Sequence, residues 1–204
     1  LDGSCRREQG FEGVASAVYS APRYKNGDLI EGEPTIPTSI RLNSLEEIIV
    51  LFLGDGSIRK FDRKGVQSVL LQSGVIKSPS DIALNNEDDL FVVSASDKKV
   101  YKVVNDNEVI VVAGTDNISA TALDGVVATE SALGDPVSID FDISNRLYIA
   151  DNLFGSIRVV TSDGMISTLT ERGDRIFNID QLRVNNYKLT TLYTCLLYTS
   201  DAAD

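Results

Sequence analysis

PVSIDFDISNRLYIADNLFGSIRVVTSDGMISTLTE, residues 136–171, is a series of short strand-forming segments separated by turn residues. Leu147–Ala150 is rich in aromatic and β-branched residues, which pack well on a pleated sheet. In Ser156–Val160 apolar and polar residues alternate, as expected of a half-buried strand. Ser162–Gly164 then supplies the glycine that a tight hairpin turn needs at positive φ. The stretch therefore predicts an antiparallel sheet of four short strands.

The same pattern occurs in two earlier segments, so the chain contains internal repeats. Pro37–Gln72 and Pro79–Gly114 align with Pro136–Glu171 without a gap, and each begins with proline. A repeat of about 40 residues with four antiparallel strands has the length of a β-propeller blade. We therefore predict an all-β fold, a β-propeller of four-stranded antiparallel blades in an incomplete ring. Residues 179–194 are predicted to be the remnant of a further blade, and residues 1–36 a divergent partial blade with a connecting loop.

The predicted strands fall at equivalent positions of the three repeats. The first strands carry apolar pairs, at Ile40/Leu42, Ile82/Leu84 and Ile139/Phe141. The second strands are Ile48–Leu51, Leu90–Val93 and Leu147–Ala150, the third are Ser57–Phe61, Lys99–Val103 and Ser156–Val160, and the fourth are Gln67–Leu71, Val109–Ala113 and Ile166–Thr170. A parallel solenoid is the main competing architecture, but a hairpin turn inside every repeat favours the antiparallel blade.

An insertion, Thr115–Asp135, lengthens the connection between the second and third repeats. Within it, Val127–Leu133 is predicted to form a short helical turn on one face of the ring. Loops carried by a rigid sheet are common positions for binding residues. We therefore expect the insertion to be the segment that contacts a partner.

Residues 111–170 resemble an NHL repeat. The resemblance rests on landmarks in a fixed order: Val112-Ala113-Gly114, Asp124-Gly125, Ala128-Thr129, Ala132-Leu133, Pro136, Leu147–Asp151, Ile157-Arg158 and Asp163–Ile166. It implies that residues 37–194 consist of NHL-type blades and that the parent protein is a closed propeller with six blades.

The sequence departs from the NHL pattern at two positions of the repeat. The family usually has glycine two residues after the proline, where this chain has Ser39, Asp81 and Ser138. The residue that ends the second strand is Asp151 in the third repeat, but the other repeats have Phe52 and Ser94. The second departure disfavours a repeated, Asp-based ligand site.

The composition restricts the chemistry that the chain can perform. It has no His, a formal net charge of −11, and 30 acidic against 19 basic residues. Histidine is the commonest general base and zinc ligand, and the sequence also lacks a nucleophile elbow, a phosphate-binding loop and a Cys-x-x-Cys pair. We predict no catalytic residue, no metal site and no cofactor. No apolar run reaches the length of a membrane span, and the acids of Glu46-Glu47 and Glu87–Asp89 are expected to be solvated turn residues.

Four residues are candidates for contact with a ligand or partner: Asp124, Asp151, Asn152 and Arg158. Asp124 and Asp151 have the carboxylates that a hard cation prefers. The stronger interpretation is that Asp151, followed by Asn152, bonds nearby backbone NH groups and fixes the turn. Arg158 and its counterpart Arg59 are expected to face outward and to pair with neighbouring carboxylates, the alternative being contact with an acidic partner.

The two ends of the sequence are expected to differ from the natural protein. The chain starts at Leu1 rather than Met, so we expect a start inside a longer chain. Cys195–Asp204 is similar to one translated frame of a transposon-type sequencing adapter, which would end the natural sequence near Thr194 and leave Cys5 as its only cysteine. Asn117–Ser119 is a glycosylation sequon, a motif short enough to arise by chance.

The sequence favours a non-catalytic scaffold that binds a protein or small-molecule partner through rim loops. The alternative is a lyase or hydrolase with a metal near the propeller axis, whose ligands would lie mostly in blades outside this sequence. The second alternative, RNA binding, is disfavoured because it needs clustered Lys and Arg. The sequence indicates neither the ligand nor the compartment.

Overall fold

The computed structural model describes residues 24–25, 28–29, 36–117, 121–169, 179–185 and 188–193. The chain divides into two units between Glu33 and Pro34. In the first unit, β1 (Tyr24–Lys25) pairs with β2 (Asp28–Leu29). All other strands belong to the second unit. Within the described ranges, no helix is long and apolar enough to cross a membrane.

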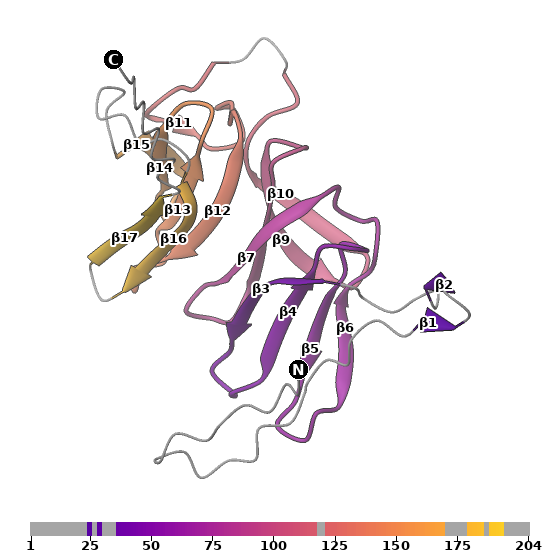
Figure 1. The fold of residues 1–204 in the computed structure, drawn as a ribbon. Coiled ribbons are helices and arrows are strands. Elements are labelled where there is room, and N and C mark those ends of the chain that lie inside the picture. Colours follow the sequence, from indigo (N-terminus) through magenta and orange to yellow (C-terminus); the bar gives the residue numbers. More distant parts are fainter. Residues whose placement is uncertain are drawn as a thin grey trace, which may run out of the picture. The chain divides into compact units, whose positions relative to one another are not determined.

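The second unit is a succession of antiparallel sheets, each built from strands that follow one another in the sequence (Figure 1). Blade 1 consists of β3 (Pro37–Leu42), β4 (Ile48–Phe52), β5 (Ile58–Phe61) and β6 (Gln67–Leu71). Blade 2 consists of β7 (Pro79–Leu84), β8 (Leu90–Ser94), β9 (Lys99–Asn105) and β10 (Glu108–Ala113). Blade 3 consists of β12 (Pro136–Phe141), β13 (Leu147–Asp151), β14 (Ser156–Val160) and β15 (Met165–Thr168), with β11 (Val126–Val127) added beside β15. A two-stranded sheet follows, formed by β16 (Ile179–Asn185) and β17 (Lys188–Tyr193).

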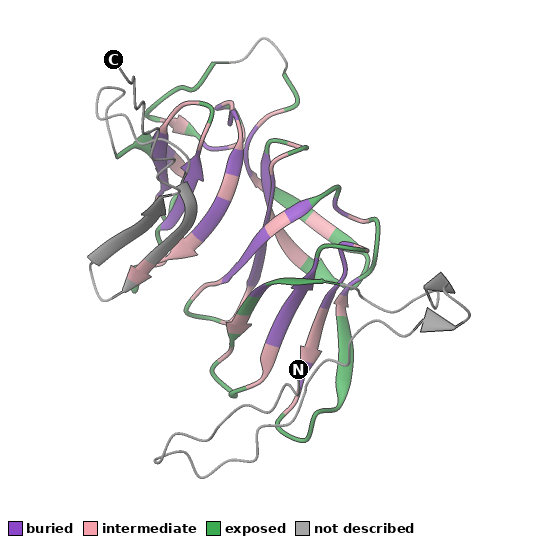
Figure 2. Ribbon diagram, viewed as in Figure 1, coloured by how far each residue is buried: buried purple, intermediate pink, exposed green. Residues whose placement is uncertain are grey.

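The blades pack face to face through apolar side chains. Successive side chains of a strand point to opposite faces of its sheet. Ile82 and Val92 of blade 2 therefore join a core cluster with blade 1, while their neighbours Ala83 and Val93 join a cluster with blade 3. All four are fully buried, and Figure 2 shows the buried stretches along the blade strands. Each blade is thus stabilised by its neighbours.

The first strands of successive blades lie next to one another, which makes them the inner strands of the arrangement. β7 contacts β3 on one side and β12 on the other, and β12 contacts β16. The backbone NH of Val184 in β16 donates to Asp140 of β12 at 2.7 Å. This is the predicted β-propeller, an all-β fold of four-stranded antiparallel blades in an incomplete ring.

The first strand of blade 1 differs from its counterparts in exposure. Ile82 and Ile139 are fully buried against the preceding blade, whereas Ile40 is 62% and Leu42 is 61% exposed. The structure describes no blade against that side of β3. Within the described residues, no neighbouring blade covers the apolar pair of the first repeat.

The turns between the first and second strands share one conformation. In each, an Asn or Asp side chain accepts bonds from the backbone NH groups two and four residues later; these residues are Asn43, Asn85 and Asp142. The residue three positions later has positive φ without being glycine: Glu46 at 59°, Asp88 at 63° and Asn145 at 56°. The side-chain bonds hold a backbone conformation that L-residues otherwise avoid.

Some turn acids that were expected to be solvated are ion-paired instead. Glu47 accepts from Lys60 at 2.9 Å and Asp89 from Lys102 at 2.6 Å. The lysine bond lowers the pKa of each carboxyl, with burial opposing it. Glu46 is 65% exposed and pairs with Arg63 on the surface. The expectation was therefore wrong for Glu47 and Asp89, because the facing third strand supplies a lysine in blades 1 and 2.

The outer strands of the blades are irregular. The pairing of β10 with β9 shifts register twice, between Glu108 and Val109 and between Val111 and Ala113. The pairing of β6 with β5 shifts once, next to Ile58. In blade 3 the outer strand β15 is instead paired with β11 over Val126 and Val127.

Candidate functional site

The insertion between β10 and β12 is fastened to blade 3 over much of its described length. Gly125 NH donates to the carbonyl of Ile166 at 2.8 Å, and Ala128 NH donates to that of Gly164 at 2.9 Å. Ala128 and Leu133 are buried in the cluster between blades 2 and 3. The helical turn predicted for Val127–Leu133 does not form: Val127 belongs to β11, which was not predicted, and only a single hydrogen-bonded turn follows at 128–130. The insertion instead pairs with β15 through Val126 and Val127.

The side chain of Arg158, in β14, forms hydrogen bonds with the middle of the insertion. Its side chain is 1% exposed, and Nη2 donates to the carbonyl of Leu123 at 2.5 Å, to Asp124 Oδ1 at 3.1 Å and to Ser131 Oγ at 3.3 Å. Burial lowers the pKa of the guanidinium, and the negative charges of Asp124 and Asp151 oppose this effect. The prediction that Arg158 faces outward was wrong, because the insertion covers it. The predicted pairing with a carboxylate is present.

Asp151 holds the end of the insertion. It is fully buried, and its carboxylate accepts from Gly134 NH at 2.7 Å and from Asp135 NH at 2.9 Å. Asn152 NH donates to the carbonyl of Asp135 at 3.0 Å. Asp151 thus bonds backbone NH groups, but they belong to the insertion rather than to the turn that follows it.

The four candidate residues therefore form two anchoring points rather than one pocket. Asp124 and Arg158 meet directly, whereas Asp151 and Asn152 lie at the other end of the insertion. Asp124 keeps a 55% exposed side chain. Contact of these residues with a ligand stays a prediction. In the described part of the chain, no three His, Cys, Asp or Glu side chains gather as a metal site would require. The sequon at 117–119 lies partly outside the described residues.

Replacing Arg158 by methionine tests its anchoring role. We expect backbone amides of residues 121–131 to exchange about tenfold faster, because a charge-assisted bond to the insertion is lost. The free energy of unfolding should fall by about 1–3 kcal/mol, because the Leu123 carbonyl and Ser131 Oγ lose a buried donor, while the exposed Asp124 carboxylate is left to solvent. Hydrogen exchange followed by mass spectrometry measures the first effect, and urea unfolding measures the second.

The equivalent residue of blade 1 provides the control. Arg59 pairs with Asp55, four residues earlier, at 3.5 Å. Arg59→Met should leave exchange in the insertion unchanged. Unchanged exchange in Arg158→Met as well would contradict the anchoring role.

The position that Arg59 occupies in blade 1 and Arg158 in blade 3 is occupied by Tyr101 in blade 2. Its hydroxyl donates to Asp97 Oδ2 at 3.2 Å. Burial, followed by the negative charge of Asp97, raises the pKa of Tyr101 to about 12. The folded protein holds this proton more tightly than the unfolded chain, in which tyrosine titrates near pH ~10. Tyr101 therefore stabilises the fold fully below about pH 10, and this contribution is lost as the pH rises towards 12.

Tyr101→Phe should remove this alkaline loss of stability. The free energy of unfolding of the wild type should fall more steeply between about pH 10 and 12 than that of the variant, as linkage requires. Urea unfolding at a series of pH values measures both slopes. In Asp97→Asn the pKa of Tyr101 should fall only part of the way, because burial is the larger cause. Equal slopes for Tyr101→Phe and wild type would refute the assignment.

Asp81, which was not among the predicted site residues, links the three blades. Asp81 is 5% exposed and accepts from Ser39 Oγ at 2.6 Å, from Ser138 Oγ at 2.6 Å and from Arg41 Nη2 at 3.0 Å. Backbone NH groups of Ile82 and Ile139 also donate to it. One carboxylate thus joins the inner strands of blades 1, 2 and 3. The available signal was the replacement of the NHL glycine by polar residues at all three equivalent positions.

No family model and no curated protein matches the chain. Several solved structures resemble it. Virginiamycin B lyase from Staphylococcus aureus is 12% identical with a TM-score of 0.54, and the alignment covers 85% of this chain and 62% of the lyase. A chain of the nidogen/laminin complex is 13% identical with a TM-score of 0.61, covering 84% and 65%. A protein of unknown function from Bacteroides thetaiotaomicron is 17% identical with a TM-score of 0.60, covering 72% and 41%.

The structural neighbours are β-propeller proteins, and at these identities the likeness shows the fold alone. The chain spans between 41% and 65% of the length of these three proteins. The neighbours include an enzyme and a chain from a protein complex. The assignment to the NHL family and the six-bladed parent ring remain predictions.

Proposed function

We propose that the chain is part of a non-catalytic β-propeller scaffold that binds a protein or small-molecule partner at its insertion end. This end of the blades carries the described residues of the insertion, 115–117 and 121–135, and the turns between second and third strands. The parent ring is proposed to be of the NHL type with six blades, on the residue pattern described above.

The anchoring of the insertion supports the proposal best. Arg158 and Asp151 hydrogen-bond to the insertion from blade 3. The side chain of Leu123, in the insertion, is nevertheless 43% exposed. Glu130 is also exposed. A loop that is already ordered loses less conformational entropy when it binds a partner. Rigid sheets that carry such loops are a common basis for binding sites.

The experiment compares two matched double variants of the full-length protein. Leu123→Ser with Glu130→Gln alters the exposed side of the insertion. Val66→Ser with Glu108→Gln makes the same kinds of change at exposed positions of the opposite end. Proteins and small molecules that co-purify with each variant are quantified by mass spectrometry. Loss of a partner by at least about tenfold, equivalent to about 1.4 kcal/mol, is expected for the insertion variant alone. An unchanged set of partners would overturn the proposal.

A further inference from the structure

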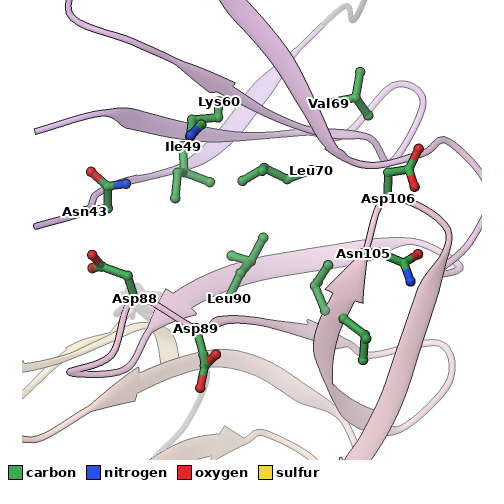
Figure 3. Close-up of a pocket in the computed structure, with 12 residues that line it drawn as sticks. Asn43, Ile49, Lys60, Val69, Leu70, Asp88, Asp89, Leu90, Asn105 and Asp106 are labelled. Atoms are coloured by element: carbon green, nitrogen blue, oxygen red, sulfur yellow. The ribbon is translucent and has the colours of Figure 1, made fainter. Parts of the chain in front are cut away.

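A groove of about 320 Å³ lies along the seam between blades 1 and 2. It runs from the turns β3–β4 and β7–β8 to the turn β9–β10, so it belongs to the end of the blades opposite to the insertion. We call it the seam groove. Figure 3 shows Ile49, Leu70 and Leu90 in its central part, with Asp88 towards one end and Asp106 towards the other.

The centre of the seam groove is apolar down to the core. Ile49 is 3% and Leu90 is 7% exposed, and both belong to the cluster between blades 1 and 2. Val69 and Val104 continue the apolar lining to the surface, where they are 38% and 52% exposed. A continuous apolar surface of this kind at a depression favours an apolar side chain of a ligand.

Each end of the seam groove carries a carboxylate, Asp88 at one and Asp106 at the other (Figure 3). Asp88 accepts from Ser44 NH at 3.1 Å, and Asp106 accepts from Gln72 Nε2 at 3.3 Å. These donors are neutral, and neither carboxylate forms an ion pair with a described residue. A cationic group of a ligand would find an acceptor at each end.

The nearby lysines are paired with other acids. Lys60, which lines the seam groove, donates to Glu47, and Lys102 donates to Asp89. Each of these lysines is therefore already neutralised by an acid other than Asp88 or Asp106. The chain as a whole has a formal net charge of −11, which attracts basic partners over a distance.

We propose that the seam groove binds an extended segment of a partner protein in which one apolar side chain lies between two basic ones. In an extended chain every second side chain points the same way. A sequence of basic, any, apolar, any and basic residues therefore presents all three side chains to the groove. The apolar one enters the centre, and the long, flexible lysine or arginine stems carry their charges to Asp88 and Asp106. This site is separate from the insertion end and goes beyond the function proposed above.

The test is a peptide selection on the full-length protein. A random heptapeptide library is selected on the wild type, and the affinity of enriched peptides is measured by fluorescence anisotropy. The expected peptides have Lys or Arg two positions on either side of an apolar residue. Asp88→Asn with Asp106→Asn should weaken their binding at least about tenfold, the effect of losing charged pairs at a partly desolvated site. Asparagine tolerates the positive φ of residue 88, so the turn should be kept.

Two controls separate charge at the groove from charge elsewhere. Glu130→Gln with Asp163→Asn removes the same number of charges at exposed positions outside the groove and should leave peptide affinity unchanged. Val69→Lys should abolish binding by filling the groove with a cation, whereas Val66→Lys, three residues earlier and outside the lining, should not.

Three results would overturn the proposal. The first is that the enriched peptides lack the basic–apolar–basic pattern. The second is that they bind the Asp88/Asp106 variant as well as the wild type. The third is that sedimentation shows a dimer that dissociates in that variant, which would assign the groove to a second copy of the chain. The proposal for the insertion end fails independently, because its Leu123/Glu130 variant should leave peptide binding intact.

Discussion

Asp81→Ala should lower the free energy of unfolding of the full-length protein by about 3–5 kcal/mol, because removing one partner of a buried ion pair leaves the other uncompensated. The guanidinium of Arg41, only 13% exposed, would lose its carboxylate. The hydroxyls of Ser39 and Ser138 would lose a buried acceptor. Each unsatisfied buried donor adds a cost of about 1–3 kcal/mol, so the upper part of the range is expected.

Guanidinium unfolding followed by circular dichroism measures this loss. Asp106→Ala is the control, since it removes an exposed carboxylate with a single neutral partner and should cost less than about 1 kcal/mol. Asp81→Asn should lie between the two, because the amide keeps an acceptor but not the charge. A loss below about 1 kcal/mol for Asp81→Ala would show that the inner strands are held together without this carboxylate.

Gly114→Ala should be similarly damaging, for a steric reason. Gly114 has φ +89°, and an added Cβ would overlap the carbonyl oxygen of Lys98 and lie 3.1 Å from Lys99 Cα. Both are backbone groups that cannot move aside cheaply. The left-handed conformation costs an L-residue about 1–2 kcal/mol and overpacking about 1–3 kcal/mol more. We expect a loss of about 3–5 kcal/mol in the free energy of unfolding.

Gly164→Ala separates the two costs. Gly164 has φ +82°, close to that of Gly114, but an added Cβ would meet nothing within 4 Å. This variant should lose only the conformational part, about 1–2 kcal/mol. Thermal or denaturant unfolding of both variants gives the difference. Equal losses would mean that the turn ending at Lys98 shifts freely when the Cβ is added.

The repeats carried enough information to predict the sheets. Strand alternation and turn residues are local properties, so Pro37–Gln72 and Pro79–Gly114 each predicted four antiparallel strands, and the structure forms them. The conformation at Glu46 was beyond local rules for that residue, which disfavour positive φ. It is set by Asn43, whose side chain bonds the backbone around it.

The candidate site was predicted only in part, because its contacts are long-range. Arg158 looks like an exposed strand residue by alternation, and only the insertion, about 35 residues earlier, makes it buried. The pattern of β11 could not be seen either, since a two-residue strand has no measurable period. In the sequence, Asp81 was visible only as a departure from the NHL pattern, which usually has glycine at this position. Such departures at equivalent positions of a repeat are worth testing as mutual contacts.

The outer strands of the blades affect how readily the protein can aggregate through edge-to-edge pairing. An edge strand with free backbone groups can pair with an edge of another molecule. In the described part of the chain β15 is covered by β11, but β10 ends its sheet and exposes half of Ile110. The two register shifts of β10 interrupt a regular ladder there, which hinders such pairing. One blade is thus protected from edge-to-edge association by an extra strand, and another by its irregular backbone.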